Sequence, residues 1–378
     1  MKHAAHLALR YMRHHKAKAV VMVAAVTLTL LLPMAVTVFV KAYEKKLGQR
    51  ADATPMVVGA KGNRFDLVLQ ALYFRAGRVD TVEMKLVREI DAQADADAVP
   101  LHVRYTAGDA PVVGTWLDTY VPFRGLALRT GAWPKRMGQA VLGSAAAQRL
   151  GIGVGDTLTT DQQNPYDLAH NMPIRLRITG ILQPTYSPDD DAVWVELDTA
   201  WLIGGHAHGH NPDAHNNEAT HRAANMAVEV TDDNAHTFHF HGDPDQLPVS
   251  AIIVRPHTDK ARTLLNARLN QNTPGVQALD PPTVMDELMG IVLQIKRFFD
   301  ANLALVAAAT AMLLGLIVTL SLKLRANERH TLHMLGCGRW LIVQTQAIEL
   351  AIVLGASTLL ALGLAYGLLA LAPRLLGV

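Results

Sequence analysis

The chain has 378 residues, 50% of them hydrophobic and 18% charged, and its mean hydropathy is +0.15. This average is too apolar for an ordinary soluble protein and too polar for a chain made only of membrane spans, so both kinds of segment are expected. The net charge of +2 creates no strong field toward nucleic acid, and a single cysteine, Cys337, excludes a disulfide scaffold.

Three long apolar runs predict membrane-spanning helices. The first covers residues 19–40, which as a helix would be about 33 Å long, enough to cross a bilayer. The second covers residues 301–322, and the third lies within residues 341–372. The third also carries small residues of the kind that let membrane helices pack closely, namely Gly355, Gly363 and Gly367. The alternative, a buried helix of a soluble core, rarely has more than about 18 consecutive apolar residues.

A cleaved signal peptide is the alternative for the first run. Its apolar stretch is longer than the roughly 7–15 residues of a signal peptide, and no small-x-small cleavage site follows before Lys41. A retained anchor is therefore favoured. Pro33 lies inside the run and is expected to kink the helix, because proline removes a backbone hydrogen bond.

The charges of the short flanking segments predict the orientation. Residues 1–18 contain five Lys or Arg and no acid, and residues 323–340 contain four against one acid. The positive-inside rule places both segments in the cytoplasm. Residues 41–300 then lie outside, as does a C-terminal tail at 373–378. The lone cysteine falls on the cytoplasmic side, which agrees with this orientation, since the exported part has no thiol to oxidise.

The exported part of about 260 residues is long enough for one large domain or two small ones. Strand patterns occur at residues 140–142, 174–182, 192–197 and 251–254, and helix patterns at 144–150, 259–270 and from Val284 into the second span. Gly151 follows the first of these helices as a stop signal. The mixture predicts an α+β architecture.

Eight of the 17 histidines lie between residues 206 and 241, a segment without apolar periodicity that is expected to be a mobile loop. Neutral imidazole is a good ligand for zinc, copper and nickel, and a flexible loop can bring several to one ion. The candidate metal ligands are His206, His208, His210, His215, His221, His236, His239 and His241.

The first three of these histidines have i, i+2 spacing, which would turn them to one side of an extended chain. The alternative is a solvated low-complexity loop with no selected role. The segment HNNEATH at 215–221 lacks the H-E-x-x-H arrangement and its helix, so it does not indicate a protease.

Three further places in the chain bear on its chemistry. Residues 325–335 are compatible with a short amphipathic helix ended by Gly336, although a plain connecting loop is the alternative. Glu349 lies at or just inside the predicted membrane boundary, where an ionisable group is costly and usually has a partner or a function. Residues 57–62 (VVGAKG) predict a turn between a strand and a helix at 65–73. The chain contains no G-x-x-x-x-G-K-[ST] pattern, so nucleotide hydrolysis by this chain is unsupported.

Four segments carry a family resemblance. They are Thr54–Phe74 (TPMVVGAKGNRFDLVLQALYF), Gly131–Leu158 (GAWPKRMGQAVLGSAAAQRLGIGVGDTL), Ile178–Trp201 (ITGILQPTYSPDDDAVWVELDTAW), and the set Glu328, Gly336 and Glu349, with separations of eight and thirteen residues. With the layout of one span, a large exported domain and further spans, they resemble the transmembrane subunits of MacB/FtsX/LolC-type ABC transporters, the mechanotransmission class.

The resemblance implies a multi-pass protein of the bacterial inner membrane, in which the three apolar runs would form three transmembrane helices, one and then two. Its large α+β periplasmic domain would have porter-like and Sabre-like subdomains. Two permease copies would work with a separate LolD/MacB-like ATPase that binds ATP, and ATP hydrolysis would move the periplasmic domains. The chain itself would be no enzyme and hold no cofactor. The residues implied to dock on the ATPase are Arg325, Glu328, Arg329, Leu332, Leu335 and Gly336.

The chain departs from the family pattern at two places. The family usually has four spans, whereas only three are predicted here. The coupling segment has Arg329-His330-Thr331 where the family tends to have apolar residues. The histidine segment is no general family feature, but resembles a permease branch associated with zinc homeostasis in Gram-negative bacteria.

The leading hypothesis is a permease whose cargo or control involves a transition metal, most simply Zn²⁺ on the histidine segment, with a periplasmic metal-binding protein as a partner. One alternative is the export of a lipoprotein or another hydrophobic molecule, with membrane lipids as neighbours. Another is an FtsX-like regulator that drives a periplasmic hydrolase without transport. The last is a metal sensor that has no ATPase.

Overall fold

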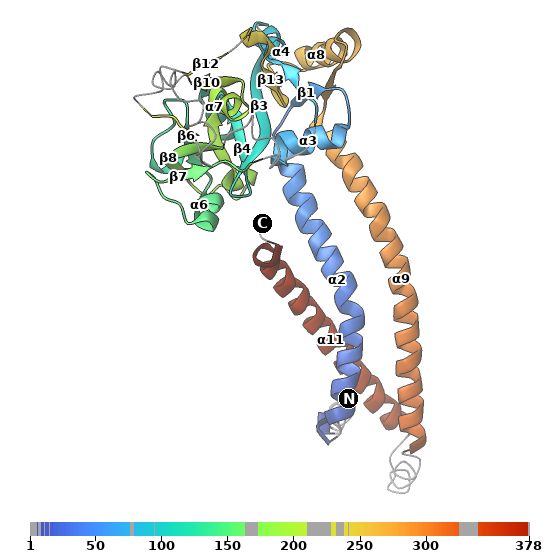
Figure 1. The fold of residues 1–378 in the computed structure, drawn as a ribbon. Coiled ribbons are helices and arrows are strands. Elements are labelled where there is room, and N and C mark those ends of the chain that lie inside the picture. Colours follow the sequence, from blue (N-terminus) through green and yellow to red (C-terminus); the bar gives the residue numbers. More distant parts are fainter. Residues whose placement is uncertain are drawn as a thin grey trace. The chain divides into compact units, whose positions relative to one another are not determined.

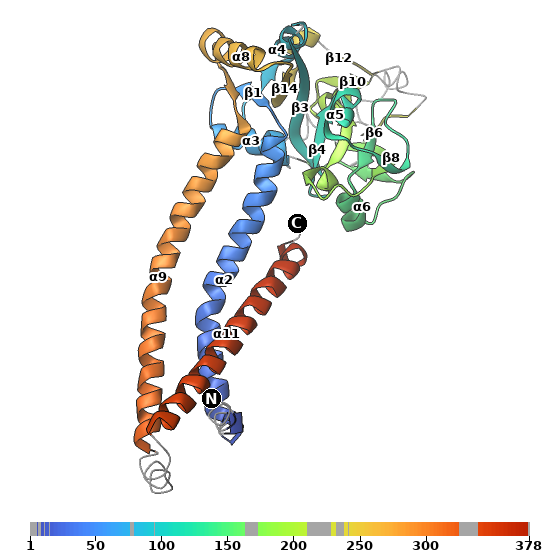
Figure 2. The same cartoon turned by 180° about the vertical axis from the view of Figure 1, so that it is seen from behind.

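The structure is a computed structural model that describes residues 6, 9–10, 12–14, 16–75, 79–93, 95–162, 173–209, 228–231, 238–240, 242–324 and 339–376. Two compact units are present (Figures 1 and 2). One consists of Met1–Leu47 and Glu287–Val378, and the other is Gly48–Asp286.

The Gly48–Asp286 unit is built on one large sheet. The strands from the beginning and the end of this segment form one part of the sheet, which has a split β-α-β pattern. Its elements are β1 (Met56–Ala60), α3 (Arg64–Tyr73), α4 (Met84–Asp91), β3 (Ala96–Ala107), β14 (Ala251–Pro256), α8 (Asp259–Asn272) and β15 (Val276–Leu279). The strand order is β3-β14-β1-β15, with every neighbouring pair antiparallel. This is the order of the ferredoxin-like β-α-β-β-α-β unit.

The chain between β3 and β14 is a long insertion into that pattern. Its first elements are β4 (Ala110–Thr115), α5 (Leu117–Arg124), β5 (Leu128–Gly131), β6 (Gln139–Leu142), α6 (Ser144–Leu150), β7 (Thr157–Thr159), β8 (Ile174–Leu182), η1 (Pro188–Asp191), β9 (Val193–Glu196) and α7 (Leu197–Ile203). The sheet continues from β3 through β4, β9, β6 and β8, and β5 and β7 also pair with β8 (Figure 1). A separate pair joins β2 (Val82–Glu83) to β13 (Pro248–Val249), just after η5 (Pro244–Gln246).

Strand β3 contributes to two apolar cores. Ala96 and Ala98 in its first half belong to the core of the ferredoxin-like part, whereas Tyr105 and Ala107 in its second half belong to the core of the insertion. The pairing of β3 with β4 shifts register between Val103 and Tyr105, which marks the change from one core to the other. The two parts of the domain are therefore joined through a continuous strand rather than through a linker.

The elements expected from the sequence of the exported part are present, with ends that differ by a few residues. Strands β6, β8, β9 and β14 and helices α6 and α8 lie where the periodicity predicts them. Gly151 ends α6 with a left-handed backbone, φ 67°, as the stop signal predicts. Helix α9 (Pro281–Leu324) begins at Pro281 rather than Val284, because proline is tolerated in the first turn of a helix.

Two expectations are wrong in part. The histidine segment is no uniform loop, since it contains β10 (Ala207–Gly209), β11 (Val228–Glu229) and β12 (Phe238–Phe240), and β11 joins the main sheet beside β8. Isolated apolar residues inside a polar segment were too few to show as periodicity. The segment predicted as a turn at 57–62 is strand β1 up to Ala60, because its valines are fully buried.

The other unit contains three long helices, α2 (Lys16–Asp52), α9 and α11 (Arg339–Leu376) (Figures 1 and 2). Within the described residues, Ala19–Lys41 and Ala347–Ala370 are long and apolar enough to cross a membrane. The predicted span at 301–322 lies in α9 and stays a prediction. Helix α2 continues through Pro33.

The contacts of α11 differ from the expectation that its glycines mediate close packing. A Cβ atom added at Gly355, Gly363 or Gly367 would meet nothing within 4 Å. Among the described residues of α11, the buried positions are spaced four apart along the helix and are Glu349, Val353, Ser357, Ala361 and Ala365. The Ser357 hydroxyl donates a hydrogen bond of 3.2 Å to the carbonyl of Val23 in α2. Val353 packs in one apolar cluster with Met22 and Val26 of α2, so this helix contact is made by Val353 and Ser357 rather than by a glycine.

The close approach of α7 to β4 generates a prediction. A Cβ at Gly114 would lie 2.3 Å from the Cβ of Ala200, so Gly114→Ala must push helix and sheet apart. We expect a loss of about 1–3 kcal/mol in the free energy of unfolding, as for other overpacked cores. Chemical unfolding of the full chain in detergent measures it. Gly62→Ala is the matched control, since a Cβ there meets nothing within 4 Å. Equal stability of the two variants would contradict the packing.

Candidate functional site

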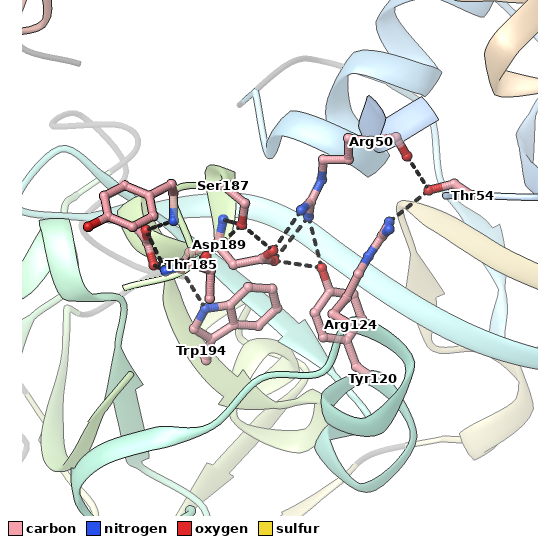
Figure 3. Close-up of polar contacts among 10 residues, drawn as sticks. Arg50, Thr54, Tyr120, Arg124, Thr185, Ser187, Asp189 and Trp194 are labelled. Carbon is pink, nitrogen blue, oxygen red and sulfur yellow. Dashed lines mark hydrogen bonds and ion pairs between the residues drawn. The ribbon is translucent and has the colours of Figure 1, made fainter. Parts of the chain in front are cut away.

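A buried ion pair lies where α2 ends. Arg50 is in the last turn of this helix, and Asp189 lies in the short helix η1 of the insertion, 139 residues later. The Arg50 guanidinium binds the carboxylate with both terminal nitrogens, Nη1 to Oδ2 at 2.6 Å and Nη2 to Oδ1 at 3.0 Å (Figure 3). Both side chains are almost completely buried. Bidentate pairs of this kind fix the direction as well as the distance between their partners.

Three neutral groups complete the surroundings of the Asp189 carboxylate and its backbone. The Tyr120 hydroxyl, from α5, donates to Oδ1 at 2.8 Å, and the Ser187 hydroxyl donates to Oδ2 at 2.7 Å. Trp194 of β9 donates its indole N–H to the Asp189 carbonyl at 3.1 Å. Arg50 also donates to the Tyr120 oxygen at 3.1 Å. The acid is thus held by groups from three elements of the insertion (Figure 3).

The local sequence SPDDD explains how Asp189 is positioned. Ser187 caps η1, accepting a hydrogen bond from the backbone N–H of Asp189, and Pro188 follows at the first position of the turn. The carboxylate of Asp190 accepts hydrogen bonds from the backbone N–H groups of Thr185 and Tyr186. The turn packs so closely on Gly143 that a Cβ there would lie 2.2 Å from the Asp190 carbonyl oxygen.

A second arginine closes the other side of the pair. Arg124, the last residue of α5, donates from Nη2 to the Thr54 hydroxyl at 2.8 Å, and Thr54 donates to the Arg50 carbonyl at 2.9 Å. The Arg50 guanidinium lies 5.2 Å from the centre of the Phe74 ring, a cation–π distance. We call the set Arg50, Thr54, Tyr120, Arg124, Ser187, Asp189 and Trp194 the Arg50 junction (Figure 3).

The electrostatics of the junction favour the ionised pair. Burial opposes ionisation of Asp189, but the charge of Arg50 and the hydrogen bonds from Arg50, Ser187 and Tyr120 outweigh it and hold the pKa of the carboxyl below its usual value. Burial, reinforced by the adjacent carboxylate, raises the pKa of Tyr120, so its hydroxyl stays a hydrogen-bond donor. No group of the Arg50 junction is an activated nucleophile. The arrangement therefore suits a rigid structural contact rather than catalysis.

The predicted metal ligands are only partly described. His206 lies half-buried after α7, His208 lies in β10, and His239 is exposed in β12. The other predicted ligands lie outside the described residues: His210, His215, His221, His236 and His241. In the described part of the chain, no three His, Cys, Asp or Glu residues are grouped so that they could hold a metal ion.

The predicted ATPase-docking residues also lie outside the described residues, and they are Arg325, Glu328, Arg329, Leu332, Leu335 and Gly336. Glu349 is described. It lies in α11, inside the apolar window Ala347–Ala370, and is 8% exposed. An acidic group in this place is expected to matter for helix packing or function.

Sequence analysis missed the Arg50 junction. Arg50 was one of several basic residues after the first apolar run, and Asp189 was one acid in a polar turn. Neither position has periodicity or a motif that indicates burial, and only the pairing across 139 residues reveals it. His102 was missed too. Burial, with Arg104 and His206 nearby, lowers its pKa to about 3, so this core histidine is neutral.

The buried pair predicts strong coupling between two substitutions. Arg50→Met or Asp189→Leu alone leaves an uncompensated buried charge, and each is expected to lower the free energy of unfolding by about 3–5 kcal/mol. The double variant should lose much less than the sum of the two. Chemical unfolding of the four proteins measures the cycle. The matched control is the exposed pair of Arg88 and Asp245, also 2.6 Å apart, for which about 1 kcal/mol or less is expected.

His102 predicts a pH dependence. Its folded pKa of about 3 lies below the ordinary value of 6.5, so unfolding takes up a proton between these pH values. Stability conferred by the neutral ring is complete above pH 6.5 and falls as the pH falls, by at most about 1.4 kcal/mol per pH unit. Unfolding free energies of wild type and His102→Leu between pH 7 and pH 4 should therefore differ in slope. Identical slopes would contradict this account.

A comparison of the sequence with known protein families identifies the domain that contains the Arg50 junction. The profile of the family described as MacB-like periplasmic core domain matches residues 20–237, more than half of the chain. The match begins in α2 and includes Arg50, Tyr120 and Asp189. A search of curated proteins gave no match. The matched length is sufficient to assign the family: the chain belongs to the proteins with a MacB-like periplasmic core domain and is a permease of the MacB/FtsX/LolC type.

Proposed function

We propose that this chain couples a separate ATPase to movement of its periplasmic domain, as the membrane subunit of a MacB-like ABC transporter. The family match supports a permease-type role in the inner membrane. The observation that carries the rest is the Arg50 junction, because α2 holds both the candidate span Ala19–Lys41 and, in its last turn, Arg50.

The first mechanical step is the transfer of a displacement from α2 to the insertion. If the end of α2 moved alone, the two hydrogen bonds between Arg50 and Asp189 would break inside a buried site. An arginine and a carboxylate separated there, away from water, would each pay a large desolvation penalty. Moving the insertion together with the helix avoids this penalty. Tyr120 and Trp194 hold Asp189 to α5 and β9, so the insertion follows as a whole.

The second step uses β3. Because this strand contributes to both cores, a displacement of the insertion also reaches the ferredoxin-like part. We assign these two parts to the porter-like and Sabre-like subdomains of the family, the ferredoxin-like part being the porter-like one. Helix α9 leaves the ferredoxin-like part and continues toward the predicted second span, which gives the domain a second connection to the membrane segments.

The proposed cytoplasmic contacts with the ATPase are based on the sequence alone. We propose three spans at 19–40, 301–322 and 341–372, with the N-terminus in the cytoplasm and two permease copies in the working unit. Residues 325–339 would form the coupling helix, and Arg325, Glu328, Arg329, Leu332, Leu335 and Gly336 would dock on the ATPase. ATP would bind to that partner, since no phosphate-loop pattern occurs in this chain.

We further propose that the cargo or its control involves a transition metal such as Zn²⁺. The supporting observation is the concentration of eight histidines within residues 206–241. Export of a lipoprotein or another hydrophobic molecule, or FtsX-like control of a periplasmic hydrolase, would use the same fold, because the fold does not determine the cargo. Zinc-independent movement with a lipoprotein bound would favour the first of these alternatives, and zinc-independent activation of a periplasmic hydrolase would favour the second.

Docking on the ATPase can be tested by replacing residues 328–336 with a Gly/Ser linker of the same length. We expect an ATPase to copurify with the full wild-type chain and to be lost from the linker variant, because the side chains that would contact it are gone. The Arg50→Met/Asp189→Leu variant is the control and should retain the ATPase. Unchanged copurification of the linker variant would contradict the coupling role.

Transmission through the Arg50 junction has its own test. A spin label is placed at exposed Lys135 in the insertion, after Cys337→Ser, and the distance between labels in two copies is measured with and without ATP by pulsed EPR. We expect the ATP-dependent change in distance to disappear in Arg50→Met/Asp189→Leu while ATP hydrolysis continues. The control is Arg88→Met/Asp245→Leu, which removes an exposed pair and should respond as wild type. A full response of the junction variant would refute transmission at this site.

A further inference from the structure

Two of the histidines are brought together by strand pairing, although 31 residues separate them in the sequence. Strands β10 and β12 form an antiparallel ribbon in which Ala207 pairs with Phe240, His208 with His239 and Gly209 with Phe238. Residues directly opposite each other in such a ladder have Cβ atoms about 4.5–5.5 Å apart and share one face of the ribbon. His208 and His239 are such a pair.

The packing of the ribbon shows which face they share. Ala207 is 3% exposed, and Phe238 and Phe240 pack against the core of the insertion. The ring of Phe240 also meets Trp201 of α7 edge-on, with 6.0 Å between centroids. Because successive residues of a strand alternate between faces, positions 208 and 239 lie on the outer face, and His239 is exposed. A ligand from solvent can therefore approach the outer face of the ribbon at His239.

We propose that His208 and His239 together bind one late divalent cation, of the zinc, copper or nickel class, on the outer face of the β10–β12 ribbon. Two imidazole nitrogens at about 2.0–2.1 Å from one ion fit the separation of a directly opposed pair, and water can fill the remaining coordination positions. The inference rests on the proposed metal-linked role, and it assigns the first site of that role to paired strands rather than to the segment between them.

The position of the pair gives its occupancy a structural consequence. The inner residue Phe240 packs against both apolar cores of the domain, so the ribbon lies where the two parts meet. A metal ion bound to both strands would keep the three paired positions of this ribbon together, although the two strands are far apart in the sequence. Binding to the folded ribbon alone stabilises the folded domain by linkage. Metal occupancy would thereby strengthen the contact between the two parts.

The test is a Zn²⁺ titration of the full chain in detergent, without any affinity tag, against a chromophoric chelator. His208→Asn/His239→Asn is compared with the control His215→Asn/His221→Asn, which removes two histidines of the same segment. We expect the pair variant to bind one equivalent of zinc with an affinity lowered by more than about 100-fold, since even changes around metal ligands lower the affinity by about 10–100-fold. The control should keep that equivalent. Cu²⁺ bound to the wild type should show two imidazole nitrogens by pulsed EPR.

Thermal unfolding without metal verifies that the pair variant is folded. Zinc should raise the unfolding temperature of the wild type and the control, but not that of the pair variant. Unweakened binding by the pair variant, or equal loss of that equivalent from both variants, would overturn the site. The titration requires neither ATPase nor cargo, so such a result would leave the proposed permease role intact, whereas failure of the ATPase and EPR tests would leave the metal site intact.

Discussion

The ion pair between Arg50 and Asp189 is the interaction on which the rest of this domain depends. It joins the last turn of a helix that begins as an apolar span to an acidic turn in the insertion, with two hydrogen bonds of 2.6 and 3.0 Å. A buried ion pair adds little net stability compared with an apolar contact of the same shape, but breaking it is costly. A pair that is costly to break is suited to a contact that has to stay formed when the helix is displaced, as in the proposed function. The direction of the contact is fixed by Tyr120 and Ser187, which donate to the same two carboxylate oxygens as Arg50, and by Trp194, which donates to the Asp189 carbonyl.

The insertion could have been connected to the ferredoxin-like part by a flexible linker, and the structure instead shares a strand. Because β3 lies in one hydrogen-bonded sheet from Ala96 to Ala107, the two cores cannot separate without breaking backbone pairs with β4 and β14. In the proposed mechanism, a displacement passes first through the buried ion pair and then through the sheet. Together they give a physical reason why movement of α2 would reach the whole domain, as the proposed function requires.

The histidine segment shows how a polar sequence can be organised by a few apolar residues. Phe238 and Phe240 pack on the core and bring their strand against β10, and this pairing sets His208 opposite His239. The composition of the segment alone would not have singled out these two histidines, whereas the register of the two strands does.

The sequence by itself determined the apolar helices, the α+β character of the exported part and most of its strands. These features depend on local periodicity, as in β8 at Ile174–Leu182, or on chain stops such as Gly151. The family resemblance also followed from the sequence. The tertiary structure alone decided that Arg50 meets Asp189 and that position 208 pairs with position 239 in the β10–β12 ribbon, because contacts between residues far apart in the chain leave no periodic signal. It also decided that Val353 and Ser357, rather than a glycine, contact α2 from α11, since helix rotation is set by packing and not by composition.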